Sequence, residues 1–123
     1  MAGSPPVRFG FSRARRIKQP RDFARARVAG RRLVCGCLIA NVLPLPAGQP
    51  SRLGVVTGKK IGGAVERVRA RRLLRETFRL HQHDFSTPID LVLIARPSIA
   101  GKTFGEVERD FLKVLRQGRR DNQ

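Results

Sequence analysis

The spacing of apolar residues along the chain predicts three helices. The clearest pattern spans residues 64–82, where 3.6 residues per turn gather six side chains on a face that can pack on a core, namely Ala70, Leu73, Leu74, Thr77, Phe78 and His81. A shorter helix is expected from Pro20, a favourable first helical residue, to Gly30, a common stop. Its apolar side is Phe23, Ala24 and Val28.

The third helix begins with a capping box. Thr103 and Glu106 have the spacing at which the two residues cap each other's backbone N–H groups, and the helix that they open runs to about Gln117. Its apolar stripe consists of Val107, Phe111, Val114 and Leu115.

Runs of apolar and branched residues predict the strands. Residues 33–43 are almost continuously apolar, which suits a strand buried on both faces, and residues 52–57 and 89–95 supply further strands. The segment 44–50 is rich in proline and is a connection. The predicted order is therefore helix, strands, helix, strand, helix, with no internal repeat.

The length of the chain suits one small domain. Its 123 residues are 41% hydrophobic, enough for a modest core. We expect a flexible basic arm over residues 1–12, a single folded domain over residues 13–117 and a frayed tail over residues 118–123. No segment approaches the roughly 18 apolar residues of a membrane span, and the N-terminus lacks the apolar core of a signal peptide. We therefore expect a cytoplasmic protein.

Charge narrows the choice of partner. The chain has 26 Lys and Arg against 9 Asp and Glu, a net charge of +17. Such an excess indicates a polyanionic partner, either nucleic acid or an acidic membrane surface.

The predicted helix over residues 64–82 concentrates this charge. Only Glu66 and Glu76 offset six arginines outside its apolar face, namely Arg67, Arg69, Arg71, Arg72, Arg75 and Arg79. Like charges at i, i+4 destabilise an isolated helix, and a solvated charged face usually alternates in sign. Arginine can grip two phosphate oxygens at once and can also stack on a base. The pattern therefore favours a phosphate-binding face over a merely solvated one.

Residues for catalysis or metal binding by the protein are not evident. A metal-dependent nuclease needs clustered carboxylates, whereas the nine acidic residues are scattered. His81 and His83 point in different directions on a helix, and no third ligand is apparent. Cys35 and Cys37 lie in an apolar run where a disulfide would be strained, so we expect small buried side chains in a reducing compartment.

The basic segment and its surroundings resemble the protein subunit of bacterial ribonuclease P. The family hallmark is a strand with Arg-Ile/Leu-Gly, a Ser-Lys-Lys-like turn and a helix that opens Ala-Val-x-Arg-Asn-Arg-x-Lys-Arg-x-x-Arg-Glu. This chain has Arg52-Leu53-Gly54, then Gly58-Lys59-Lys60, then Ala64-Val65-Glu66-Arg67-Val68-Arg69-Ala70-Arg71-Arg72-Leu73-Leu74-Arg75-Glu76. The resemblance covers about residues 10–117 and includes the basic lead-in to the first helix.

The resemblance implies a fold and a function. The fold would be a small α+β domain like the second domain of ribosomal protein S5, with helices packed on a mixed sheet of about four strands and a left-handed βαβ crossover. The family's RNA subunit, with Mg²⁺, hydrolyses precursor tRNA to remove its 5′ leader, while the protein binds both RNAs. The chain would thus be a non-catalytic component of an endoribonuclease, a hydrolase. It would have no tightly bound cofactor of its own, no small-molecule substrate and no membrane partner.

The resemblance also implies two sites. Contacts to the catalytic RNA and its metal ions would come from Lys59, Lys60, Arg67, Arg69, Arg71, Arg72 and Arg75. A cleft for the single-stranded leader would contain Phe23, Arg27, Ile39 and Asn41.

The chain departs from the family pattern at three positions in or beside these sites. Val68 replaces the Asn of the arginine motif, Arg27 stands where a second aromatic ring is common, and Asn41 replaces a larger ring. Less stacking on the leader implies that charge contributes more.

Composition leaves another class of function open. A ribosomal or chaperone-like RNA-binding protein would share the size, the charge and the fold. The pair of lysines followed by the arginine helix favours ribonuclease P. A DNA-binding protein is less well supported, because no helix-turn-helix spacing is evident.

Overall fold

The computed structural model describes residues 15–85 and 87–121. The arm expected over residues 1–12 and the last two residues, 122–123, lie outside the described residues. Three helices, four strands and two short 3₁₀ turns follow in the predicted order, namely α1 (Pro20–Ala29), β1 (Arg31–Cys35), β2 (Leu38–Pro44), β3 (Arg52–Val56), η2 (Lys59–Ile61), α2 (Ala64–His81), β4 (Ile89–Ala95), η3 (Pro97–Ile99) and α3 (Phe104–Asp121).

The four strands form one mixed sheet in the order β1-β2-β4-β3. β2 pairs antiparallel with β1 and with β4, while β3 pairs parallel with β4. A parallel pair needs a crossover connection, which here is α2. The α+β class and the four-stranded mixed sheet are therefore confirmed.

The single strand predicted over residues 33–43 is wrong. The segment is a hairpin in which Cys35 pairs with Leu38, so that Gly36 and Cys37 form a two-residue turn. Gly36 has φ +58°, a conformation that glycine adopts without steric cost. The carboxylate of Asp110 in α3 accepts a hydrogen bond from the Cys37 N–H at 3.0 Å. The turn is thus held by a residue far along the chain.

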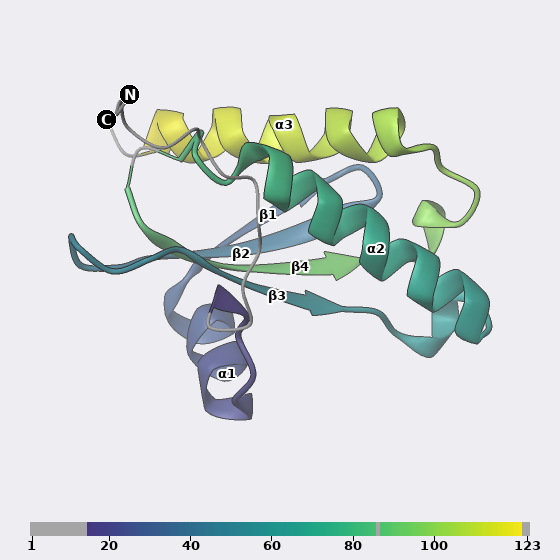
Figure 1. Cartoon of the computed structure of the whole chain (residues 1–123), viewed down its shortest axis with the longest axis horizontal. Coiled ribbons are helices and arrows are strands. Elements are labelled where there is room, and N and C mark those ends of the chain that lie inside the picture. Colours follow the sequence, from purple (N-terminus) through teal and green to yellow (C-terminus); the bar gives the residue numbers. More distant parts are fainter. Residues whose placement is uncertain (1–14, 86, 122–123) are drawn as a thin grey trace, which may run out of the picture.

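One face of the sheet carries the main core. The helices α2 and α3 cover this face (Figure 1). Alternate residues of β4 belong to the apolar cluster that they form with the sheet. The α2 residues Ala70, Leu74 and Phe78 are fully buried there. The predicted stripe of α3 is buried as well, and its capping box is formed, with Thr103 Oγ1 accepting from the Glu106 N–H at 3.2 Å.

The other face of the sheet carries α1 (Figure 1). Ala26 packs there with Ile17 and Val92. The predicted apolar side of α1 is partly wrong, because Val28 is 80% exposed whereas Asp22 is buried. Asp22 lies 3.6 Å from Arg52, whose guanidinium also donates two hydrogen bonds, of 2.8 and 2.6 Å, to the buried carboxylate of Asp90. A charged network therefore replaces part of the expected apolar contact.

Candidate RNA-binding surfaces

The core-facing side of α2 fixes where its arginines lie. Because Ala70, Leu74, Thr77 and Phe78 are buried against the sheet and α3, the residues between them occupy the flanks and the outer side of the helix. Arg69 and Arg72 are exposed, whereas Arg67, Arg71 and Arg75 are half-buried. The structure thus keeps all the predicted arginines of α2 at least partly accessible.

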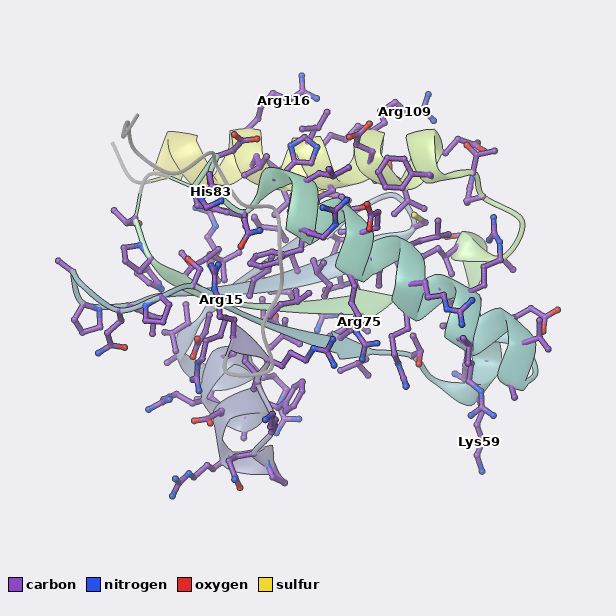
Figure 2. The ribbon with its side chains drawn as sticks, in the orientation of Figure 1. Arg15, Lys59, Arg75, His83, Arg109 and Arg116 are labelled. Atoms are coloured by element: carbon purple, nitrogen blue, oxygen red, sulfur yellow. The ribbon has the colours of Figure 1, made fainter. Side chains whose placement is uncertain are left out.

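One flank of α2 faces β3. Arg71 donates a hydrogen bond of 2.9 Å to Thr57 Oγ1, just after the strand. Arg75 points from the helix toward β3 (Figure 2). Burial, together with the nearby charges of Arg16 and Arg71, lowers the pKa of the Arg75 guanidinium from its ordinary value. Within the described chain Arg75 has no carboxylate partner. The guanidinium groups of Arg16, Arg71 and Arg75 therefore form a cationic cluster.

The two predicted lysines extend this charge beyond the helix. Lys59 and Lys60 are exposed on η2, directly before α2, and Lys59 points away from the protein (Figure 2). Gly62, with φ +145°, and Gly63 then lead the chain into the helix. The N-terminus of a helix carries partial positive charge, so the lysines and the helix end reinforce one another.

The α1 face of the sheet contains an open row of aliphatic side chains. Strand pairing aligns one residue from each strand across the sheet, and this aliphatic row consists of Val34, Ile39, Ile94 and Val56. All four are half-buried or exposed. Of these residues only Ile39 was predicted as a site residue, because the others become neighbours only once the register is known.

Phe23 reaches the sheet next to this row. Its ring lies directly over Gly54 of β3, where a Cβ atom would come within 2.6 Å of Phe23 Cε1. Glycine is therefore required for this close approach. Asp22 faces Arg52 on one flank of α1. Phe23 and Arg27 lie about 100° and about 140° further round the helix, so they occupy the other flank. Arg27 is exposed there.

Asn41 differs from the other predicted cleft residues. It lies one pleat from Ile39 on the same face, level with Val92, but only 2% of its surface is exposed. Its Oδ1 atom is buried and has no hydrogen-bond partner among the described residues. Asn41 therefore lies at the buried bottom of the predicted cleft, next to α1, whereas Ile39 remains accessible.

A basic pocket of about 250 Å³ joins the two predicted sites. This edge pocket lies beside the outer edge of β3, where Ile17 donates a backbone hydrogen bond of 2.8 Å to Leu53. Three cations and an aromatic ring contribute to its lining, which is Arg16, Ile17, Lys18, Phe23, Leu53, Gly54, Val55 and Arg75. Sequence reasoning missed Arg16 and Lys18 as site residues, although the basic lead-in before α1 was recognised.

The remaining candidates for chemistry have structural partners. His81 bridges Asp84 and Glu108, at 2.8 Å each, and Cys35 and Cys37 are buried free thiols. Burial and the hydrogen bond to Asp110 raise the pKa of Cys37 to about 12, so this thiol stays protonated. Over residues 15–85 and 87–121, no three His, Cys, Asp or Glu side chains gather as metal ligands, and no helix is long and apolar enough to cross a membrane.

Comparisons with known proteins identify the family of the chain. The family model described as Ribonuclease P matches residues 11–119. A ribonuclease P protein component of Chloroflexus aggregans is 36% identical over 106 residues, which are 85% of this chain and 78% of that protein. The ribonuclease P protein component of Gluconacetobacter diazotrophicus is 35% identical over 106 residues, which are 85% of this chain and 91% of that protein.

Solved structures of the same family have the same fold. The RNase P protein of Staphylococcus aureus superposes with a TM-score of 0.77 at 27% identity, covering 86% of this chain and 96% of that one. The RNase P protein of Thermotoga maritima gives a TM-score of 0.72, also at 27% identity, with 83% and 96% covered. The chain therefore belongs to the ribonuclease P protein family, whose members take part in tRNA 5′ processing as components of a ribonucleoprotein.

Proposed function

We propose that this protein binds the ribonuclease P RNA through α2 and the 5′ leader of precursor tRNA through the α1 face of the sheet. The observation that carries this proposal is the edge pocket, which places Phe23 and Arg75 around one basic hollow. A single strand needs both a positive path for its phosphates and a ring for its bases, and the pocket combines the two.

The α2 surface suits a structured RNA. It comprises Lys59, Lys60, Arg67, Arg69, Arg71, Arg72 and Arg75, and their charge is largely unneutralised by carboxylates. Phosphates would relieve the repulsion around Arg75 and release counterions, so binding is expected to weaken steeply with salt. Magnesium ions bound by the RNA would lie near this surface.

The α1 face suits an extended leader. The aliphatic row offers an apolar strip across the whole sheet, with Phe23 at one end and the exposed Arg27 on the adjacent helix. Precursor tRNA carries the leader and the mature product does not, so contacts here would raise affinity for the substrate alone. The protein would thus favour substrate over product without taking part in bond cleavage.

Hydrolysis is assigned to the RNA subunit and its Mg²⁺ ions. In this proposal the protein acts as a cytoplasmic RNA-binding component, and its side chains position RNA rather than transfer protons. Of the carboxylates on or near α2, Glu76 pairs with Arg79 and Glu106 caps α3.

Cleavage of a leader-bearing precursor tRNA at low Mg²⁺ tests the proposal. A bacterial ribonuclease P RNA is assayed with and without the protein, and the 5′ end of the product is mapped. We expect stimulated cleavage at the mature 5′ end and none by the protein alone. Tight RNA binding without stimulation would instead favour the ribosomal or chaperone-like function.

Phe23→Leu tests the leader contact within the same assay. Leucine keeps apolar bulk over Gly54 but removes the ring, so we expect weaker binding of precursor tRNA and unchanged binding of mature tRNA. Equal losses for the two RNAs would refute the role given to Phe23.

A further inference from the structure

The outer side of α2 contains an apolar surface that phosphate binding does not explain. Val65 is 78% exposed and Val68 is 44% exposed, and the two lie one turn apart. Both line a hollow of about 970 Å³ along the helix, together with the half-buried side chains of Leu73 and Phe104. We call this hollow the α2 groove.

Isolated exposed valines are common on protein surfaces and carry no information alone. Here the apolar side chains are contiguous, and Phe104 is contributed by a different helix, α3. Arginines stand among them, with Arg69 and Arg72 lining the same groove. An apolar floor with a cationic rim matches a ligand that is itself apolar on one side and anionic on the other.

We propose that the α2 groove receives an unstacked nucleobase of the ribonuclease P RNA. The base would contact Val65, Val68 and Phe104, while Arg69 and Arg72 bind its flanking phosphates. The inference rests on the function proposed above and adds to it that α2 recognises a base as well as the phosphate backbone.

Charge decides between this occupant and a protein. A second copy of the chain would bring another +17 charges toward the arginines. Among the described residues that line the groove, the one carboxylate, Glu76, is already paired with Arg79. A nucleotide presents a flat base beside a phosphate, and arginine can contact both parts. The groove is also large enough for a base, because a drug-sized ligand site begins at about 300 Å³.

The proposal predicts a salt signature that separates base from phosphate contacts. Loss of one phosphate contact lowers the slope of log K against log salt by about 0.7–0.9, whereas loss of an apolar contact leaves the slope unchanged. Val68→Ser, which removes the apolar contact without restoring the Asn of the family motif, should therefore weaken assembly about tenfold at every salt concentration, so that its plot runs parallel to that of the unsubstituted protein. Arg72→Gln should instead make the slope of log K against log salt less steep.

The experiment measures binding of the full-length protein to ribonuclease P RNA between about 50 and 300 mM salt. In this range the Debye screening length is on the order of 10 Å. Val68→Ile should retain affinity, since it keeps the apolar contact. Val28→Ser is the matched control, because Val28 is also an exposed helical valine but lies on α1. It should bind like the unsubstituted protein. If Val68→Ser folds poorly, Val65→Ser provides the same test at a more exposed position.

Three results would overturn the inference. Unchanged affinity of Val68→Ser, in a protein that still stimulates cleavage, would remove the base contact and leave the proposed function intact. Concentration-dependent dimers that Val68→Ser abolishes in sedimentation would assign the groove to a second copy of the chain. Failure of the unsubstituted protein to bind the RNA would reject the proposed function, and this inference with it.

Discussion

His81 provides a pH-dependent connection between α2 and α3 that can be tested directly. Its Nδ1 lies 2.8 Å from Asp84 Oδ2 and its Nε2 lies 2.8 Å from Glu108 Oε2. Carboxylates only accept hydrogen bonds, so both ring nitrogens must donate, and the ring is then an imidazolium. Its ring also stacks near Phe111, with centroids 5.9 Å apart. We consider the substitution His81→Leu, which keeps apolar packing and removes both hydrogen bonds.

The sign of the pH dependence follows from the direction of the pKa shift. Burial opposes the charge on His81, but the hydrogen bonds and charges of Glu108 and Asp84 outweigh it and raise the pKa above its ordinary value of 6.5. The folded state therefore binds the proton more tightly than the unfolded state. This stabilisation is complete below the unfolded pKa and is lost as pH rises through the folded pKa.

The magnitude follows from the exposure of the three side chains. Side-chain exposure is 18% for His81, 48% for Asp84 and 31% for Glu108, so both carboxylates regain water when the histidine is removed. Each pair should then contribute about 1 kcal/mol, nearer to a surface ion pair than to a buried one. His81→Leu should cost about 2 kcal/mol at pH 6, whereas at pH 9 neutral histidine donates once and the cost is roughly 1 kcal/mol.

Urea unfolding of both proteins at pH 6 and pH 9 measures these costs. The chain has only two histidines, so the His81 pKa can also be followed directly by proton NMR. The same cost at both pH values, or a larger one at pH 9, would refute the doubly paired imidazolium.

Three further predictions concern other contacts. Gly54→Ala should displace the Phe23 ring by about 1 Å and lower the free energy of unfolding in urea by about 1–2 kcal/mol. It should weaken binding of precursor tRNA more than binding of mature tRNA, and equal losses would contradict the leader contact of Phe23. Arg52→Leu should destabilise by about 3–5 kcal/mol because it leaves the buried Asp90 unpaired, and Asp90→Leu added to it should recover part of that loss. Thr103→Ala should lower the free energy of unfolding by about 1 kcal/mol through loss of the α3 cap, with RNA affinity unchanged.

The helices were predictable because local rules determine them. The apolar stripe of α2 and the capping box at Thr103 act within a few residues, and both are present as expected. The hairpin at Gly36 was missed because its turn depends on Asp110, which the sequence places in a later helix. Continuous apolar character cannot by itself distinguish one long strand from two strands that share a core.

The same distinction applies to the candidate sites. The arginines of α2 were identifiable from the absence of offsetting acids, a property of the helix alone. The aliphatic row required the strand register, which brings Ile94 beside Ile39. Asn41 was expected in the cleft, but its burial depends on how α1 packs against β2 and β4. Tertiary contacts therefore determine which predicted residues are accessible.

Strand β3 explains why the two proposed RNA-binding surfaces meet. The chain leaves β3 to form α2, so Arg75 lies above this strand, while the segment before α1 pairs with its outer edge and positions Arg16 and Phe23. Cations gathered in this way repel one another in the free protein. The fold tolerates this electrostatic repulsion because the opposite, apolar side of α2 packs into the core with α3 around Phe78. RNA bound at the edge pocket would remove that repulsion, so binding would stabilise the same strand that positions both surfaces.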